Sequence, residues 1–357
     1  MKPKPKRSIV HVPQDVIFDH ILPRIPAKSG CRFRCVSKEW HSFLTSDTFK
    51  NKHNHRHIDD HENNLKLLVL SKTKTSIEFT TIDCEAPPSD KDSTPTRRPL
   101  PPFEGITPRR IYILASFHGL VCLGIQETYV YVYSHLILWN PLTNEYKRLS
   151  KSTPLMNGYI WYYRSIFGLY YSCCEDDYKF LFVDYFDHNV YIYSLKSDSW
   201  RKVDVFQHTL HPGSPSRGTY LNENLYFLKA NSSGRLDSII RFDTKTERFS
   251  KIETPNVDAN PNAYSTNYYD TIMVKSDCIH VCVKYDINIS CDNGFERTTC
   301  IKLWKLDEND NMKEVLTCQL RPHVDGISMS YLVPLHLLEN GNCLMRNCSC
   351  HNIKFMK

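Results

Sequence analysis

A segment built around two aromatic residues recurs along the chain and restricts its fold more than any other feature. In three copies, residues 136–149, 190–203 and 238–252, an apolar run ends in an aromatic, a short polar residue follows, and a second aromatic comes seven residues after the first. The first aromatics are Trp139, Tyr193 and Phe242, the polar residues are Asn140, Ser194 and Asp243, and the second aromatics are Tyr146, Trp200 and Phe249. Short polar residues favour turns, so each copy predicts a β-hairpin with its aromatics packed across the strands.

A fourth, less regular copy occupies residues 300–316. It keeps the first aromatic, Trp304, but has Asn311 at the position of the second. In the regular copies an aliphatic residue stands ten positions after the first aromatic. If one residue is inserted, Met312 fits the position of the second aromatic and Val315 fits that of the aliphatic residue. The four first aromatics are 54, 49 and 62 residues apart, which indicates a repeat rather than unrelated hairpins.

Each hairpin is preceded by a further apolar run, which predicts another strand. The runs are Leu120–Leu123, Tyr178–Val183, Leu225–Leu228 and Ile279–Val283. Three to four strands in a repeat of roughly 50 residues are typical of a kelch-type propeller blade. A β-sandwich also contains aromatic hairpins, but the near-constant spacing favours an all-β, propeller-like domain over residues 65–357. The number of blades is left open.

Residues 12–49 have a helical pattern instead. Pro13 suits a first helical turn, and an apolar stripe at helical spacing follows it. The stripe, which we expect to form the core of this unit, consists of Phe33, Val36, Trp40 and Phe43. A helical unit of roughly forty residues buries little surface alone, so we expect it to complete its core against a partner.

Three polar segments separate or flank these units. Residues 1–9 form a basic tail, for which a nuclear-import signal is the alternative to a solvated segment. Residues 50–64 form a linker, and residues 86–110 form a proline-rich surface loop. The linker contains several histidines beside acidic residues, namely His53, His55, His57 and His61. A metal site there is the alternative to a solvated linker, which we favour because no apolar surroundings support it.

The sequence contains no motif of a known catalytic site. A glycine-rich phosphate loop, G-x-S-x-G, H-E-x-x-H and C-x-x-C are all missing from it. Near the C-terminus Cys343, Cys348, Cys350 and His351 cluster, but their spacing matches no standard zinc motif. We therefore predict no catalytic residue, no metal, no cofactor and no enzyme activity.

Charge and cysteine content bear on partners and compartment. The net charge of +6 is spread along the chain, so no nucleic-acid surface is predicted. No apolar run reaches the roughly 20 residues of a membrane helix. The 14 cysteines follow no secretory leader, so we expect reduced thiols and a cytoplasmic or nuclear protein.

Residues 12–49 resemble the F-box of plant F-box proteins. The matches include Asp15, Arg24, Lys28, Ser29, Arg32, Cys35 and Lys38 besides the apolar positions. Pro23 and Gly30 depart from the family pattern, in which a polar residue and a leucine are usual. The resemblance implies an F-box at residues 10–49 that binds a Skp-family adaptor. The residues implied to contact the adaptor are Val12, Pro13, Val16, Ile21, Leu22, Ile25 and Pro26.

The remainder resembles the F-box-associated domain of the same plant proteins. The matching segments are Gly119–Leu123, Leu138–Leu149, Asp177–Lys179, Val190–Arg201 and Ile239–Phe249, in the family's order. Departures include Glu223-Asn224 and Tyr226, where the family often has N-G and a His-Trp pair. The two resemblances imply an α+β multidomain protein, a small helical F-box followed by an all-β, kelch-like domain.

The resemblance also implies a function. The chain would be the non-catalytic substrate receptor of a Skp–cullin–F-box ubiquitin ligase, reaching cullin and RING subunits through the adaptor. Its β-domain would bind an unknown target protein, whose contact residues the sequence does not indicate. Two alternatives stay open: an F-box scaffold that joins no ligase, and a ligand-binding or glycan-binding propeller that carries an F-box.

Overall fold

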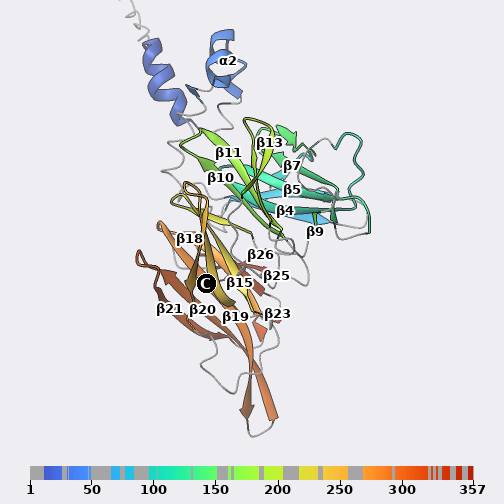
Figure 1. Ribbon diagram of the computed structural model, residues 1–357, viewed down its shortest axis with the longest axis vertical. Helices are drawn as coiled ribbons and strands as arrows, with labels where there is room; N and C mark the ends of the chain where they lie inside the picture. The colour runs from blue at the N-terminus through green and yellow to red at the C-terminus, as the bar shows by residue number, and fades with distance from the viewer. Residues whose placement is uncertain are drawn as a thin grey trace, which may run out of the picture.

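The computed structural model is mostly β-structure, with short helical segments at one end (Figure 1). It describes residues 12–25, 30, 32–46, 48–49, 66–72, 77–83, 96–101, 103–129, 132–150, 160–161, 165–184, 189–203, 217–231, 236–255, 268–291, 294–320, 323–324, 327–328, 332–337, 343–347 and 353–356. Within these ranges, none of the helices is both long and apolar enough to cross a membrane.

The N-terminal segments include a π-helix at Val16–Ile21, a 3₁₀-helix at Leu22–Arg24 and the helix α2 at Lys38–Thr45. Ser37 begins α2, because its hydroxyl accepts a hydrogen bond from the Trp40 backbone N–H at 3.1 Å. This cap interrupts the continuous stripe predicted from the sequence. Residues 34–36 form a turn, and Val36 is 59% exposed within it. The prediction that Val36 belongs to the helical core is therefore wrong.

Five antiparallel sheets follow one another along the chain. Four of them have four strands and the fifth has three. In chain order, they contain β4 (Arg110–Phe117), β5 (Leu120–Gln126), β7 (His135–Trp139) and β8 (Tyr146–Arg148); β10 (Ser165–Ser172), β11 (Asp177–Asp184), β12 (Asn189–Ser194) and β13 (Ser199–Val203); β14 (Thr219–Leu221), β15 (Asn224–Ala230), β16 (Leu236–Asp243) and β17 (Arg248–Glu253); β18 (Tyr268–Lys275), β19 (Cys278–Cys291), β20 (Gly294–Leu306) and β21 (Met312–Leu320); and β24 (Leu332–Leu337), β25 (Cys343–Asn347) and β26 (Ile353–Met356).

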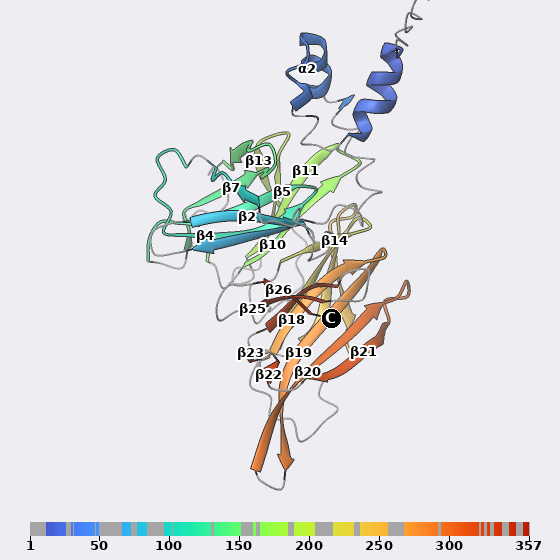
Figure 2. The ribbon, with the colours of Figure 1, turned by 180° about the vertical axis from the view of Figure 1, so that it is seen from behind.

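The first strands of neighbouring sheets contact each other, in the order β4, β10, β14, β18 and β24. Such a succession of sheets around their first strands is a β-propeller arrangement. The predicted all-β repeat domain is thus confirmed. The hairpin of β19 and β20 is the longest, and it projects from the end of the molecule opposite the helices in both ribbon views (Figures 1 and 2).

A sixth sheet packs on the first of these five. It consists of β1 (Lys66–Lys72), β2 (Ile77–Asp83) and β3 (Thr96–Arg98), and Figure 2 shows β2 beside β4. The contact includes Phe79 and Trp139, whose ring centroids are 4.8 Å apart. Because β3 pairs with β2, the predicted proline-rich loop at 86–110 contains a strand. Two short pairs, β6 (Val132–Tyr133) with β9 (Ile160–Trp161) and β22 (His323–Val324) with β23 (Ile327–Ser328), are the other described strands.

The three regular copies of the sequence template form hairpins at β7–β8, β12–β13 and β16–β17. In each, the two aromatics lie directly opposite one another: Trp139 faces Tyr146, Tyr193 faces Trp200, and Phe242 faces Phe249. Each first aromatic is completely buried. The ring centroids are 5.2 Å apart in the second hairpin and 4.8 Å apart in the third. Cross-strand aromatic pairs of this kind stabilise a hairpin beyond the area that they bury.

The polar residue at the start of each turn holds the backbone of the turn. Its side-chain oxygen accepts hydrogen bonds from backbone N–H groups two to four residues further on. The bonds join Asn140 to Leu142 and Thr143, Ser194 to Ser197, Asp243 to Lys245 and Thr246, and Asp307 to Asn309 and Asn311. A short polar side chain therefore holds each of the four turns, directly after the first aromatic in the regular copies and three residues after Trp304 in the fourth.

A residue with positive φ stands five positions after each first aromatic of the regular copies. These residues are Asn144 (φ 62°), Asp198 (φ 50°) and Glu247 (φ 56°). After glycine, the left-handed region is least costly for Asn and Asp. Asn144 Oδ1 accepts a hydrogen bond from Trp139 Nε1 at 3.0 Å, and Asp198 accepts one from the Tyr193 hydroxyl. The left-handed residue thus satisfies the polar atom of a buried ring.

We expect Asp198 to contribute to acid lability. The hydrogen bond from Tyr193, with further help from Lys147, holds the pKa of Asp198 below its ordinary value. A carboxyl whose folded pKa lies below its unfolded pKa of about 3.9 stabilises the fold above that pH, and this stability is lost as the pH falls through the folded pKa. The midpoint temperature of thermal unfolding should therefore decrease as the pH is lowered below about 4.

Scanning calorimetry of wild type and Asp198→Asn between pH 7 and pH 2.5 tests this expectation. Asparagine keeps the left-handed backbone and an acceptor oxygen but does not titrate, so the variant should lose less stability on acidification. Identical acid limbs in the two proteins would show that Asp198 contributes nothing to the pH dependence.

The fourth hairpin, β20–β21, departs from the expected alignment. A β-bulge between Leu303 and Trp304 pairs Trp304 with Glu314 and Leu303 with Leu316, so Val315 has no partner across the hairpin. Val315 is 54% exposed, and Met312 lies opposite Leu306. Trp304 thus faces a residue ten positions later, so the prediction that a single insertion brings Met312 and Val315 onto the template is wrong.

Candidate functional site

The helical segments form a small apolar cluster, called here the head. Leu22, Leu44 and Phe49 are buried at its centre. Around them four rings make edge-on contacts, with centroids between 4.7 and 6.2 Å apart. These rings belong to Phe18, Phe33, Trp40 and Phe43, with Phe49 touching Phe43. Phe33, Trp40 and Phe43 are the predicted core residues, whereas Phe18, Leu44 and Phe49 were not predicted.

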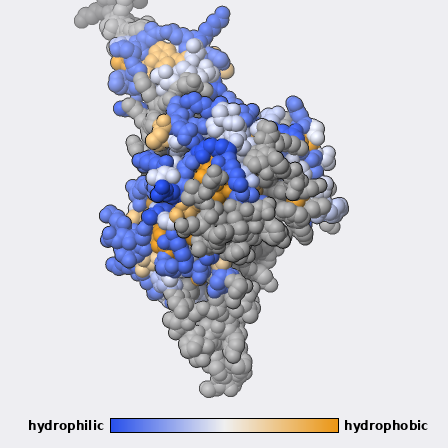
Figure 3. All heavy atoms as spheres, in the orientation of Figure 1, coloured by the Kyte–Doolittle hydropathy of each residue, from blue (hydrophilic) through white to orange (hydrophobic). Residues whose placement is uncertain are grey.

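The residues predicted to bind the adaptor divide into two groups. Val12 is 42% exposed and Ile21 is 44% exposed, Pro13 is also exposed, and Val16 and Ile25 are half-buried. Leu22 instead has no exposed surface and belongs to the core of the head, which corrects its assignment to the contact surface. Pro26 lies outside the described residues. Figure 3 shows hydrophobic surface on the head, at the top of the molecule.

Gly30, which departs from the family pattern, lies buried and helical in the head. A Cβ atom added there would lie 3.9 Å from both Ile25 and Phe49, an ordinary van der Waals distance. Gly30→Ala is therefore expected to stabilise the head by about 0.5–1 kcal/mol, because alanine loses less backbone entropy in a helix.

Hydrogen exchange of the α2 amides measures this gain as slower local opening. Gly119→Ala is a matched control, since Gly119 has φ +76° and alanine is strained in that conformation. The Gly119→Ala variant should lower the stability of the β-domain, in which Gly119 lies. Faster exchange in Gly30→Ala would contradict the expected fit.

The head touches the β-domain at the turn between β7 and β8. Arg34 Nη1 lies 3.7 Å from Glu145 Oε1, and the Arg34 side chain is 28% exposed. The sequence places Arg34 on the polar side of a helix and Glu145 in a hairpin turn, 111 residues later. Nothing in either segment predicts the contact, because it depends on how the two units sit together.

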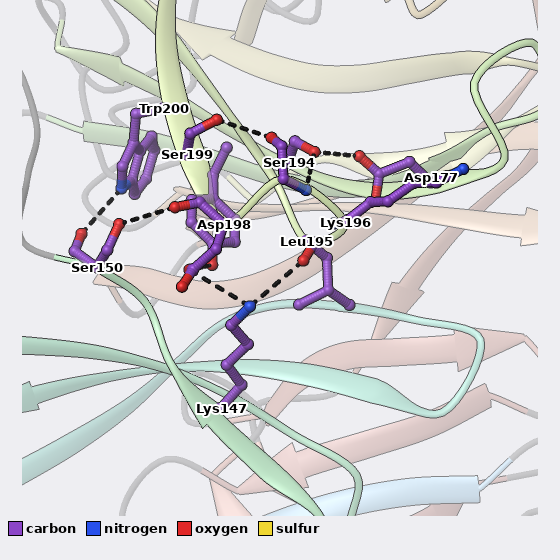
Figure 4. Close-up of polar contacts among 11 residues, drawn as sticks. Lys147, Ser150, Asp177, Ser194, Leu195, Lys196, Asp198, Ser199 and Trp200 are labelled. Carbon is purple, nitrogen blue, oxygen red and sulfur yellow. Dashed lines mark hydrogen bonds and ion pairs between the residues drawn. The ribbon is translucent and has the colours of Figure 1, made fainter.

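Polar contacts join the hairpin turns of successive sheets (Figure 4). Lys147 on β8 donates to the Leu195 backbone oxygen at 3.3 Å and lies 3.3 Å from Asp198. Trp200 Nε1 donates to the Ser150 backbone oxygen at 3.1 Å. The next sheets are joined by Arg201 with Glu247, and by Arg241, both of whose contacts to the Asp310 carboxylate are 2.9 Å long.

These contacts follow the repeat. A basic residue eight positions after one first aromatic pairs with an acidic residue five positions after the next, as in Lys147 with Asp198 and Arg201 with Glu247. Exposed pairs contribute little individually. Their effect is to fix how neighbouring sheets are aligned along one face of the domain.

The turns between the first two strands of the sheets lie closer to the centre of the domain. Three such hairpins bring aromatic rings together, and we call this group the inner-turn cluster. It consists of Phe117 and His118 at β4–β5, Tyr171 and Tyr178 at β10–β11, and Tyr220 at β14. The ring centroids of Phe117 and Tyr220 are 4.5 Å apart, and those of Tyr171 and Tyr178 are 5.1 Å apart.

Two of these turns have positive φ at both central residues. In β14–β15 the turn is Asn222-Glu223, with φ of 46° and 59°. A residue with positive φ is usually glycine or asparagine at such a site. Glu223, which departs from the family pattern, thus takes a left-handed conformation, and its side chain pairs with Lys245.

No group of three or more metal-ligating side chains comes together within the described part of the chain. The histidines of the 50–64 linker lie outside that part, as do Cys348, Cys350 and His351. The cysteines whose side chains the structure describes, Cys35, Cys122, Cys173, Cys174, Cys278, Cys282 and Cys300, are free thiols, and burial raises the pKa of Cys122 well above its ordinary value. A thiol in that state is a poor nucleophile.

Comparison with known proteins gives one family. The model of the F-box associated beta propeller domain matches residues 73–331. The F-box protein CPR1 of Arabidopsis thaliana is 24% identical over 358 residues, covering 91% of this chain and 76% of that protein. The putative F-box protein At1g47730 and the F-box/kelch-repeat protein At3g44120, from the same plant, are 28% and 26% identical, each over 70% of this chain.

The chain spans only 61% and 63% of the length of the latter two relatives. Among solved structures, an auxiliary nutrient binding protein from Bacteroides ovatus aligns with a TM-score of 0.42 and 8% identity, covering 81% of this chain and 68% of that one.

Proposed function

The chain belongs to the family of the F-box associated beta propeller domain, and from that premise we propose that it is the substrate receptor of a Skp–cullin–F-box ubiquitin ligase. The head would act as the F-box and bind a Skp-family adaptor, which links it to the cullin and RING subunits. The β-domain would bind the target protein. Both the order of the two units and the relatives named F-box proteins support this division of roles.

The observation that carries the proposal is the exposed apolar surface of the head. Val12 and Ile21 each expose more than two fifths of their surface, on a unit whose cluster has three buried apolar side chains among the described residues. Covering such side chains with a partner removes apolar surface from water, at about 25 cal/mol per Å². An adaptor that packs on this surface would extend the small core of the head.

The receptor itself would supply no bond-making group. Its contribution would be proximity, because holding the target and the charged conjugating enzyme in one assembly converts their encounter into an effectively intramolecular one. On this proposal the protein is non-catalytic, and it acts in the cytoplasm or the nucleus, where thiols stay reduced.

Binding to a purified Skp-family adaptor tests the head. Ile21→Asp should weaken the complex at least tenfold, about 1.4 kcal/mol, because it places a charge in the proposed contact. Val36→Asp is the matched control, since Val36 is equally apolar, more exposed and outside the proposed surface. Wild type that does not bind the adaptor, or equal loss in both variants, would refute the proposal.

Reconstitution with cullin and RING subunits separates the receptor from a scaffold. Self-ubiquitination of the full chain in the complete assembly is expected, and Ile21→Asp should suppress it. An adaptor complex that never recruits the cullin would instead favour the scaffold.

A further inference from the structure

The inner-turn cluster gathers five aromatic or histidine side chains from three sheets on one face of the β-domain. His118 stacks on Phe117 with ring centroids 3.6 Å apart, and both lie 6.4 Å from Tyr178. Phe117 is 9% exposed, whereas the other four members are half-buried. Tyrosine is among the residues enriched at the positions that contribute most to binding in protein interfaces.

Charge at these turns departs from that of the chain as a whole. The four described turns between first and second strands, residues 118–119, 173–176, 222–223 and 276–277, contain no lysine or arginine, although the chain carries a net charge of +6. They contain four acidic residues, Glu175, Asp176, Glu223 and Asp277. Glu175 and Glu223 form ion pairs with Lys179 and Lys245, so Asp176 and Asp277 supply the negative charge that is not paired with a lysine in these contacts.

The surrounding contacts hold these carboxylates beside the rings. The Tyr171 hydroxyl donates to Asp176, and Lys179, which is nearly buried, donates to Glu175. Burial is the main cause that raises the pKa of Tyr220 to about 12. The hydroxyls of the cluster therefore stay protonated at neutral pH and act as donors.

The head lies on the same side as this cluster. In an antiparallel meander the turn after the first strand and the turn after the third strand lie at the same end of the strands. His118 and Gly119 follow β4, the first strand, and Glu145 follows β7, the third. Arg34 of the head contacts Glu145, so a molecule bound at the cluster would lie on the face that the head approaches.

We propose that the inner-turn cluster is the target-binding surface and that it takes an exposed segment of the target carrying lysine or arginine side chains. This inference rests on the proposed receptor function and names the chemistry of its partner. Cations are attracted to the faces of aromatic rings, and carboxylates beside those rings strengthen the attraction and set its specificity. The same carboxylates repel acidic segments and phosphate groups.

A selection from a random dodecapeptide library on the immobilised full chain tests the chemistry. Lysine or arginine should be enriched in the selected peptides, and a synthetic consensus peptide should bind more weakly as salt is raised. Selected peptides that are neutral or acidic, or no selection above background, would overturn the inference.

Two double variants locate the binding. Asp176→Asn with Asp277→Asn removes two charges at residues with φ of 50° and 51°, where asparagine is tolerated, and it should weaken the consensus peptide at least fivefold. Glu308→Gln with Glu314→Gln removes the same charge from exposed positions at the outer edge of the fourth sheet and should leave the affinity unchanged. Equal loss in the two pairs would overturn the location.

The outcome is separable from that of the proposed function. Adaptor binding depends on the head and is measured with Ile21→Asp, whereas peptide binding depends on the inner turns. Intact adaptor binding with no cationic preference refutes this inference alone. A cationic preference without adaptor binding refutes the ligase role and keeps the surface.

Discussion

Replacing Trp139 with alanine is expected to lower the free energy of unfolding of the β-domain by about 3–5 kcal/mol. Trp139 is completely buried, and its ring lies against Phe79 of the preceding sheet as well as within its own sheet. Its loss would leave a cavity between two sheets and would also leave Asn144 without the indole N–H that it accepts. The cavity and the lost hydrogen bond act in the same direction.

Urea unfolding followed by tryptophan fluorescence and far-ultraviolet circular dichroism measures this loss. Tyr146→Ala is the matched control, because Tyr146 lies directly opposite Trp139 in the same hairpin but is 39% exposed. It should cost no more than about 1 kcal/mol, the range of an exposed cross-strand pair. Similar losses in the two variants would show that burial does not distinguish the two aromatic positions of the template.

Leu22→Asp is expected to unfold the head. Leu22 has no exposed surface and packs with Leu44 and Phe49 at the centre of the cluster. Removing a buried leucine costs about 2–5 kcal/mol by itself. A carboxylate at the same place adds the cost of burying a charge, so a unit of this size should not remain folded.

The neighbouring substitution Ile21→Asp gives the contrast, because Ile21 is 44% exposed. Both variants should lose the adaptor, but only Leu22→Asp should lose protection of the α2 amides in hydrogen exchange. The β-domain should keep its unfolding midpoint in both. Retained protection in Leu22→Asp would mean that Leu22 does not hold the head together.

Much of the β-domain could be predicted from the sequence, because hairpins are local. The aromatic spacing of seven and the polar residue after the first aromatic lie within one turn and its two strands. The same residues that define the template, Asn140, Ser194 and Asp243, hold the turns through their own side chains. Directly opposite side chains lie on the same face of the sheet, and the second aromatic of each pair is the less buried because it stands on the last strand of its sheet.

The head was predicted less well, since a helical stripe does not reveal where a helix stops. Ser37 caps α2 and ends the preceding turn, which exposes Val36 although its spacing fits the stripe. The same limit applies to Leu22 and Ile21. They are adjacent in a motif that implies contact with a partner, yet only the packing of Phe18, Trp40 and Phe43 decides that Leu22 is inside.

The glycine at position 124 is explained only by tertiary packing. From the sequence alone, a glycine within the apolar run of β5 is expected to weaken the strand. A Cβ atom there would come within 2.6 Å of the Tyr133 ring, so the missing side chain is what lets that ring pack on the strand. Residues 132–133 pair with residues 160–161 outside the main sheet, and no local sequence pattern predicts this pairing.

The sequence by itself determined the repeat, its hairpins and the family, because each depends on residues close together in the chain. Only the tertiary structure decided how the repeats meet. Lys147 forms an ion pair with Asp198, and Arg34 forms one with Glu145. The rings of Phe117, Tyr178 and Tyr220, from three sheets, lie close together. These partners are tens of residues apart in the sequence. Their distance in space depends on the rotation of one sheet relative to the next. Burial of the sheet faces sets that rotation, and no single segment of the sequence encodes it.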